Sequence, residues 1–430
     1  MVNPHYQKMK NKATVRPGDF NKQPLWFKAL NDVWRGTYFL GTQIRLEKDD
    51  IIKSARKLTG LYDLGSDFLD EPLDRMLWSI NHEAQLHPVG RFISKQRLVN
   101  LLAVKLRAEY WFKKHPEILD QPLYPVWLIT GLQRTGTTKL QRLLAADPDN
   151  RVLASWEAIN PVPLNDDFRL KEKRIKKAWM SEKALRLMAP GFFAIHPVEH
   201  LAPEEDILLL DVTFLSTTPE ATMHVPSYAS WLESIYQAPA YEYGMKLLKF
   251  LQWQKPAKRW VLKSPHHLEF LPLVHKYFQD VRILWTHRDV HRSIPSFLSM
   301  MAHSRMIFSN NVSLQGVAAH WVRKSGYMLN KGLDFRTSDH KEGLFTDILY
   351  NDFLEDSLKS LTKIYGDNGG INEGLSERFR HAELINPPGK YGLHEYDIRD
   401  FDLSPDDIDK HTADYQHFIK DVSYGKQEKL

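Results

Sequence analysis

Short apolar runs and amphipathic segments alternate along the chain from residue 126 onward. Four runs of five to seven residues are rich in β-branched or aromatic side chains, at 126–130, 259–263, 281–286 and 344–350. Segments with apolar residues at helical spacing follow them, at 137–146, 266–278, 290–302 and 353–365. Strands that alternate with helices indicate a parallel sheet covered by helices on both faces. The pattern therefore predicts an α/β fold with a parallel sheet flanked by helices.

Two further regions carry only helical patterns. In the N-terminal region, apolar residues recur at helical spacing over 48–59, 72–85 and 95–114, and no run predicts a strand. Pro122 and Pro125 mark its end, which predicts a helical N-terminal part at 1–120 and an α/β domain at 121–430. The second region, 165–255, is expected to form a helical insertion between the first two strands.

The tail from about residue 370 is rich in glycine and charged residues, and the pattern assigns no element to it. A basic run at 171–177 is interrupted by Glu172 and has no aromatic residues between its charges that could stack on bases. This run is therefore predicted to be the solvated face of a helix, and not a nucleic-acid surface.

Composition narrows the class of protein. Hydrophobic residues make up 43% of the chain and charged residues 26%, as in ordinary globular proteins. The net charge of +5 is slight, so it suits an anionic small molecule and does not indicate a nucleic-acid partner. The chain has no cysteine, which excludes disulfides, thiol nucleophiles and cysteine zinc sites. No apolar stretch long enough for a membrane span or a secretory signal is seen, so we expect a cytoplasmic protein.

The segment 131–138, directly after the first predicted strand, has the spacing of a phosphate-binding loop. Gly131 and Gly136 are separated by four residues, an arrangement in which backbone N–H groups converge on an anion. In nucleotide triphosphatases a lysine follows the second glycine and reaches the β- and γ-phosphates, whereas this chain has Thr137. The positive charge lies within the loop instead, as Arg134. The loop therefore predicts a phosphate-like ligand other than the end of ATP or GTP.

A second candidate anion site follows the run at 281–286. Arg288 comes just after that strand, and Ser293 and Ser296 lie on the helix that begins there. A guanidinium group suits a phosphate, and hydroxyl donors and the positive end of a helix add to the attraction. In the alternative interpretation, Arg288 pairs with a neighbouring aspartate, Asp280 or Asp289, at the surface. Together with the loop, the site predicts a ligand with two phosphate groups.

These motifs resemble those of sulfotransferases that use 3′-phosphoadenosine-5′-phosphosulfate (PAPS). In that family a loop after the first strand binds the 5′-phosphosulfate, and an arginine with a serine eight residues later binds the 3′-phosphate. Residues 133–138 match the R-T-G-T-T loop of the bacterial branch, and blocks at 145–148, 156–158 and 346–353 resemble that branch too. The resemblance implies PAPS as donor, adenosine 3′,5′-bisphosphate as product and no metal requirement. It implies donor binding by Arg134, Thr135, Gly136, Thr137, Thr138, Arg288, Ser293 and Ser296.

Sulfuryl transfer builds negative charge on the bridging oxygen of the donor, so hydrogen-bond donors aimed at that oxygen should matter most. The resemblance assigns this task to Arg134, at the position where cytosolic sulfotransferases carry lysine. It also places Lys263 near the transferred group.

Two residues are candidates for the general base that takes the acceptor's proton. Glu157 follows the loop at a distance similar to that of the catalytic glutamate in tyrosylprotein and heparan sulfotransferases. His266 lies in a segment similar to the K-T-H segment of the cytosolic enzymes, shifted by one residue. Each has a structural alternative, because Glu157 can pair with Arg134 or Arg151, and His266 can belong to an ordinary first helical turn. The two candidates stay open at this stage.

A third polar set lies in the insertion and comprises His196, His200, Glu204 and Glu205. The two glutamates are expected to begin a helix, and the set could line an acceptor site, whereas a metal site is not expected. The aromatic residues Phe192, Phe193 and Phe214 favour an apolar acceptor such as a sterol, a phenol or a lipid alcohol.

The sequence therefore predicts a PAPS-dependent sulfotransferase that acts on a hydroxyl group of a small acceptor, with the insertion at 165–255 on the acceptor side. Two alternatives remain: a nucleotide or metabolite kinase built on the same loop, and a nucleotide-binding module without catalytic activity. The kinase requires a Mg²⁺-binding partner and the missing lysine. The binding module would lack a base near the loop, whereas Glu157 and His266 are both available.

Overall fold

The computed structural model describes residues 14–15, 23–68, 70–123, 125–166, 171–278, 280–338, 341–366, 369–387 and 389–427. Its centre is a five-stranded sheet with the order β3-β4-β2-β5-β6, in which every neighbouring pair is parallel. The strands are β2 (Val126–Thr130), β3 (Asn150–Val152), β4 (Arg259–Lys263), β5 (Val281–His287) and β6 (Phe345–Leu349). The predicted α/β class and all four predicted strands are confirmed. All five strands point the same way, so their carboxyl ends share one edge of the sheet.

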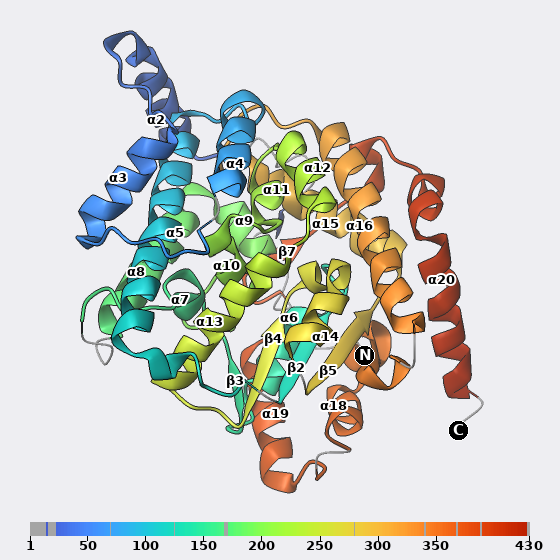
Figure 1. Cartoon of the computed structure of the whole chain (residues 1–430). Helices are drawn as coiled ribbons and strands as arrows, with labels where there is room; N and C mark the ends of the chain where they lie inside the picture. Colours follow the sequence, from blue (N-terminus) through green and yellow to red (C-terminus); the bar gives the residue numbers. More distant parts are fainter. Residues whose placement is uncertain are drawn as a thin grey trace.

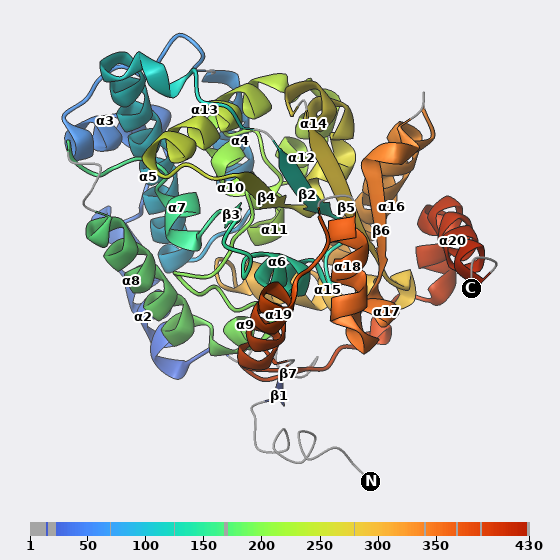
Figure 2. The same ribbon diagram turned by 90° about the horizontal axis from the view of Figure 1, so that it is seen from below.

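The sheet is buried on both faces (Figures 1 and 2). Leu128 of β2 belongs to a core shared with the N-terminal helices and with the insertion helices. Ile129, on the opposite face, packs in a second core with the helices that follow the phosphate-loop strand and β6. A third core joins β5 to the helices after it. Burial on both sides explains why the strands read as continuous apolar runs.

The N-terminal part is helical, as predicted, with α2 (Leu25–Gly36), α3 (Lys48–Thr59), α4 (Asp70–His82) and α5 (Pro88–Lys114). The described part of the insertion is helical too, with α8 (Glu172–Met188), α9 (Pro190–Ile195), α10 (Ile207–Leu210), α11 (Thr218–Thr222), α12 (Pro226–Ser234) and α13 (Ala238–Gln254). The remaining helices are α6 (Thr137–Leu144), α7 (Ser155–Ile159), α14 (Leu271–Tyr277), α15 (Val290–Met306), α16 (Leu314–Thr337), α17 (Tyr350–Glu355), α18 (Ser357–Tyr365), α19 (Glu373–Ile385) and α20 (Pro405–Gln427). Short 3₁₀ turns lie between them at η2 (Tyr38–Leu40), η3 (Pro116–Ile118), η4 (Asp211–Thr213), η5 (Pro265–Glu269), η6 (Glu342–Leu344) and η8 (Ile398–Phe401).

Two strand predictions need correction. The edge strand β3 was missed because it has three residues, of which only Arg151 is buried, so it shows no apolar run. The expectation that no strand precedes residue 125 was wrong as well. Thr14–Val15 forms the short strand β1, which pairs in parallel with β7 (Leu393–His394).

Several helix predictions also differ from the structure. The segment 266–278 divides into η5 and α14, and 353–365 divides at Asp356, whose side chain accepts a hydrogen bond from the Lys359 N–H and starts a new helix. The tail, to which no element was assigned, contains α19 and α20. Figure 1 shows α20 in red alongside α16, where Ile408 and Tyr415 pack into the third core.

Among the described residues, no helix is long and apolar enough to cross a membrane.

Candidate functional site

The segment 131–136 is the turn between β2 and α6, at the carboxyl edge of the sheet. Gly131 has a φ of 136° and Gly136 a φ of 95°, which side chains rarely allow. A Cβ atom at Gly131 would lie 2.5 Å from the Thr286 carbonyl oxygen, so only glycine lets the loop approach β5 this closely. The Thr135 hydroxyl lies 2.6 Å from both the Leu132 carbonyl and the Thr286 hydroxyl, which ties the loop to β5.

The two threonines after Gly136 open α6, where unpaired backbone N–H groups favour an anion. Thr137 is buried and Thr138 is exposed. The Thr135 hydroxyl is already used within the protein, so its backbone N–H is the group left for a ligand. The turn thus has the geometry in which backbone N–H groups can face an anion, and its role in phosphate binding stays a prediction.

Arg134 connects the loop to the second predicted anion site. Its backbone φ is 69°, in the left-handed region that a non-glycine residue seldom adopts. Its Nε donates to the Ser296 hydroxyl over 3.1 Å, and its Nη1 donates to the Ile195 carbonyl over 3.2 Å. Arg288 in turn donates from Nη1 to the Arg134 carbonyl over 2.8 Å. The structure therefore brings the predicted loop, Arg288 and Ser296 into one site.

The charges of this site are not neutralised by acidic side chains. Within the described ranges, neither Arg134 nor Arg288 is ion-paired, and the Arg288 guanidinium lies 4.2 Å from the centre of the Tyr350 ring. Burial, and then the charge of Arg288, lowers the pKa of the Arg134 guanidinium. The fully buried Ser293 hydroxyl also lacks a hydrogen-bond partner in the part of the chain that the structure describes. Two cations and an unused hydroxyl make a site suited to an anion.

A cavity of about 350 Å³ lies beside the loop, and we refer to it as the anion cavity. Basic residues from two parts of the chain line it, namely Arg134, Lys139, Arg142, Lys390 and His394, together with Thr138. Lys139 pairs with Glu383 over 2.6 Å, and Arg142 pairs with Glu199 over 2.5 Å. Lys390 lies 3.4 Å from Glu199 as well, so within the described ranges Arg134 and His394 are the members of this set without a carboxylate partner.

Sequence reasoning missed His394, which lies in the segment between α19 and α20. Its Nε2 lies 2.9 Å from the Ser299 hydroxyl, and its Nδ1 has no hydrogen-bond partner among the described residues. Burial, then Arg134 and His303, lowers the pKa of His394 to about 3, so the ring is neutral at pH 7. No periodic pattern or motif in the tail pointed to this residue.

Lys263, at the end of β4, lies in a cluster of acidic side chains from the insertion. Its Nζ lies 2.7 Å from a carboxylate oxygen of Glu205, and its backbone N–H donates to Asp206 over 3.0 Å. Burial raises the pKa of the neighbouring Glu204 carboxyl, and the nearby charge of Lys263 lowers it in part. Burial lowers the pKa of His196 to about 4. The charge of Glu205 raises this pKa in part, and those of Lys263 and Arg134 lower it further. The polar set of the insertion thus meets Lys263 and the loop arginine.

Not all of that polar set lies here. His200 is turned toward α8, where its Nδ1 lies 2.6 Å from a Glu182 oxygen. Phe192 and Phe193 line a separate apolar cavity, whereas Phe214 is fully buried in the first core.

Glu157 occupies a structural position. One carboxylate oxygen accepts a 3.0 Å hydrogen bond from Arg151 Nη2, and the other accepts from the Ala154 N–H at the start of α7. Arg151 is the pairing partner that the sequence offered as an alternative to catalysis. The geometry favours a role for Glu157 in holding β3 against α7.

His266 is buried in the turn η5 and does not line the anion cavity. Its Nδ1 lies 3.3 Å from the Thr217 hydroxyl, and its ring centre lies 6.5 Å from that of Tyr241 and 4.7 Å from that of Phe270. Burial, then the charges of His267 and Lys324, keeps its pKa well below the usual range. The Ser264 side chain caps the turn by accepting the His266 N–H, as the structural alternative expected.

Across the described ranges, no group of three histidine or acidic side chains that could hold a metal ion is found. The prediction that no metal is required stays a prediction.

Comparison with known proteins agrees with this geometry. The chain is similar to the sulfotransferase STF1 from Mycobacterium tuberculosis H37Rv, with 28% identity and a TM-score of 0.74 over 86% of this chain and 99% of that one. It has the fold of the sulfotransferase STF9 from Mycobacterium avium, with 23% identity and a TM-score of 0.77 over 87% of this chain and 97% of that one. No curated protein sequence matches the chain.

A family model spans the part of the chain that holds the phosphate loop, Lys263 and the Arg288 site. It is the model of the sulfotransferase family, and it matches residues 125–369, more than half of the chain. The chain therefore belongs to the sulfotransferase family.

Proposed function

We propose that this enzyme transfers the sulfuryl group of PAPS to a hydroxyl group of a small acceptor. The observation that carries the proposal is the pair of arginines, Arg134 and Arg288, which lie at the ends of adjacent strands and have no carboxylate partner among the described residues. A buried cation without a counter-ion is unfavourable unless a ligand supplies the charge. The unused Ser293 hydroxyl supports the same conclusion.

A donor with two anionic groups fits this site. The 5′-phosphosulfate would lie on the N–H groups of residues 135–138 with Arg134, and the 3′-phosphate would lie between Arg288, Ser293 and Ser296. The anion cavity, with Thr138 and Lys139 on one wall and Lys390 on another, offers room beside the loop for the nucleoside. When bound, PAPS supplies an activated sulfuryl group on a phosphate oxygen.

During transfer the sulfur–oxygen bond to the phosphate breaks and a bond to the acceptor oxygen forms, while the acceptor's proton passes to a base. Arg134 and the loop N–H groups would stabilise the charge on the leaving phosphate. Lys263, held by Glu205, would lie beside the transferred group. These are the roles that the resemblance implied for Arg134 at the leaving oxygen and for Lys263 at the sulfuryl group.

For the general base we propose Glu204, a residue first considered as part of the acceptor side. Glu157 is engaged by Arg151, and His266 is enclosed by Tyr241 and Phe270. Glu205 is bound to Lys263, whereas the Glu204 carboxyl has a raised pKa and lies within electrostatic range of Lys263 and Arg142. A carboxylate with a raised pKa is the better proton acceptor near neutral pH.

A transfer assay tests the proposal. Purified enzyme is incubated with PAPS labelled with ³⁵S and a panel of phenols and alcohols, and the labelled organic product is separated from labelled sulfate. The proposal predicts labelled sulfate esters whose formation requires the enzyme. A parallel reaction with γ-labelled ATP and Mg²⁺ is the control, and phosphate transfer without sulfuryl transfer would favour the kinase instead.

A further inference from the structure

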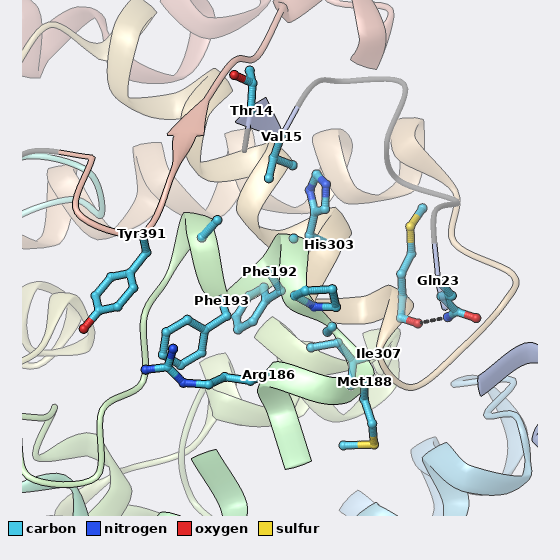
Figure 3. Close-up of a pocket in the computed structure, with 15 residues that line it drawn as sticks. Thr14, Val15, Gln23, Arg186, Met188, Phe192, Phe193, His303, Ile307 and Tyr391 are labelled. Carbon is cyan, nitrogen blue, oxygen red and sulfur yellow. Dashed lines mark hydrogen bonds between the residues drawn. The ribbon is translucent and has the colours of Figure 1, made fainter. Parts of the chain in front are cut away.

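A second cavity, of about 550 Å³, lies beside the anion cavity and has a different character. Its lining is mostly apolar and comes mainly from α8, α9 and the end of α15, with Met188, Phe192, Phe193, Met306 and Ile307 among its residues; Val15 of β1 and Tyr391 also contribute. Figure 3 shows Phe192 and Phe193 side by side among the lining side chains, with Arg186 close to Phe193. The volume is that of a site for a small organic ligand. We refer to it as the apolar cavity.

Four polar or charged residues on the wall of this cavity already have partners in the protein. Arg186 pairs with Glu182 over 2.7 Å, and the Tyr391 hydroxyl donates to Glu199. The His303 Nδ1 lies 2.8 Å from the Ser299 carbonyl, and the Gln23 amide donates to the Met306 carbonyl over 2.5 Å. A sugar or another highly polar acceptor would lose hydrogen bonds with water on entry and gain few here.

The helix α9 separates the apolar cavity from the reaction site, and it contacts both. Phe192 lines the apolar cavity, and its ring centre lies 5.8 Å from that of His196, which senses Lys263 and Glu205. The Ile195 carbonyl, at the end of the same helix, accepts a hydrogen bond from Arg134. Ala194 and Tyr391 line both cavities, so the two spaces share a wall.

We infer that the apolar cavity binds the acceptor, and that the acceptor is an amphiphilic alcohol or phenol with an extended apolar body. The body lies among the side chains of α8, α9 and α15, and the hydroxyl group lies at the end of α9, where the Ile195 carbonyl contacts Arg134. This inference rests on the proposed function, and it names the substrate class of that reaction.

A homologous series of unbranched alkan-1-ols, from butan-1-ol to decan-1-ol, measures the inferred contact. Each added methylene group removes further apolar surface from water, so kcat/KM for sulfuryl transfer from PAPS rises about fourfold per methylene until the cavity is filled. A polar acceptor site predicts a flat series. A flat series from an enzyme that still binds adenosine 3′,5′-bisphosphate would overturn the inference and leave the donor assignment intact.

Two variants locate the effect. Gly191 lies on α9, and a Cβ atom there would meet only Val15, at 3.8 Å, so a larger side chain can extend into the cavity without strain. Gly191→Leu should therefore shorten the longest alkanol that still gains affinity by several carbons. Leu187→Ser is the matched control, because Leu187 is exposed on α8 and does not line the cavity.

A binding experiment without PAPS tests the acceptor site independently of the proposed sulfuryl transfer. The uncharged fluorescent probe N-phenyl-1-naphthylamine is bound to the full chain and displaced by the same alkanols. We expect displacement to strengthen with chain length, and to be weakened at least tenfold by Gly191→Leu and unchanged by Leu187→Ser. Displacement that is identical in the wild type and Gly191→Leu would overturn the inference, whereas loss of PAPS transfer with intact displacement would count against the proposed function alone.

Discussion

Replacement of Arg134 by alanine should separate the stability of the protein from its capacity to bind the donor. In the protein without ligand, the Arg134 guanidinium donates hydrogen bonds to Ser296 and to the Ile195 carbonyl. A hydrogen bond from a charged group stabilises the folded state by about 1.5–3 kcal/mol. Burial of a guanidinium without a carboxylate partner opposes this gain. The free energy of unfolding of Arg134→Ala should therefore lie within about 1 kcal/mol of the wild-type value.

The ligand-dependent part of stability should behave differently. With adenosine 3′,5′-bisphosphate at about 100 times its dissociation constant, the wild type gains about 2.7 kcal/mol. Loss of one charged hydrogen bond worth about 2.7 kcal/mol raises the dissociation constant about 100-fold, so the variant gains only about 0.4 kcal/mol at the same concentration. The rise in Tm on addition of ligand should nearly vanish, and kcat should fall by about 10²–10³-fold if Arg134 serves the leaving oxygen.

The matched control is Arg151→Ala. Arg151 is a buried arginine that pairs with Glu157 over 3.0 Å. Removal of one partner of such a pair destabilises a protein by about 3–5 kcal/mol, and the rise in Tm with ligand should persist. Thermal unfolding of both variants, with and without adenosine 3′,5′-bisphosphate, checks the pair. The reasoning would be refuted if Arg134→Ala showed the full wild-type rise in Tm on addition of ligand, or if this variant were unfolded without ligand.

Three further predictions concern single carboxylates and one histidine. Glu204→Gln should lower kcat by about 10²–10⁴-fold and remove the acidic limb of the pH–rate profile, with the affinity for adenosine 3′,5′-bisphosphate unchanged; a wild-type kcat would exclude Glu204 as the base. Glu157→Gln should lower the free energy of unfolding in urea by about 1.5–3 kcal/mol and leave kcat near the wild-type value, whereas a stable variant without activity would restore Glu157 as the base. Burial lowers the pKa of His87 to about 4. Between about pH 6.5 and 4, the unfolded chain therefore binds a proton at this histidine and the folded chain does not. The free energy of unfolding should fall by about 3 kcal/mol as the pH falls over this range. In His87→Asn, which keeps an acceptor for the Gly90 N–H at the start of α5, urea unfolding should show a weaker loss over this range; an unchanged loss would contradict the assignment.

The central sheet was predictable because its strands are buried on both faces. All five residues of Val126–Thr130 are buried, so the sequence shows an uninterrupted apolar run. The edge strand Asn150–Val152 has no such run, and its pairing with β4 depends on contacts that local pattern does not encode. The helix α20 was missed for a similar reason, since its few buried residues, Ile408 and Tyr415 among them, are set in a mostly polar segment.

The contact of the loop with Arg288 and Ser296 was open to prediction because the spacings involved are local. The glycine bracket of the loop and the separation between Arg288 and Ser296 both reflect a strand that turns into a helix. The general base could not be predicted from the sequence, because spacing along the chain does not show which carboxylate is bound by an arginine. The pairing of Glu157 with Arg151 and the meeting of Glu205 with Lys263 arise from tertiary structure.

The central claim is that two anion sites, one at the loop and one at Arg288, hold the two phosphates of one nucleotide. Isothermal titration of the wild type with adenosine 3′,5′-bisphosphate, adenosine 5′-monophosphate and ATP–Mg²⁺ tests it most directly. The 3′-phosphate should strengthen binding about 10–100-fold over the monophosphate, and Arg288→Ala should remove most of that difference. Equal affinity for the two adenosine phosphates, or tighter binding of ATP–Mg²⁺, would contradict the claim.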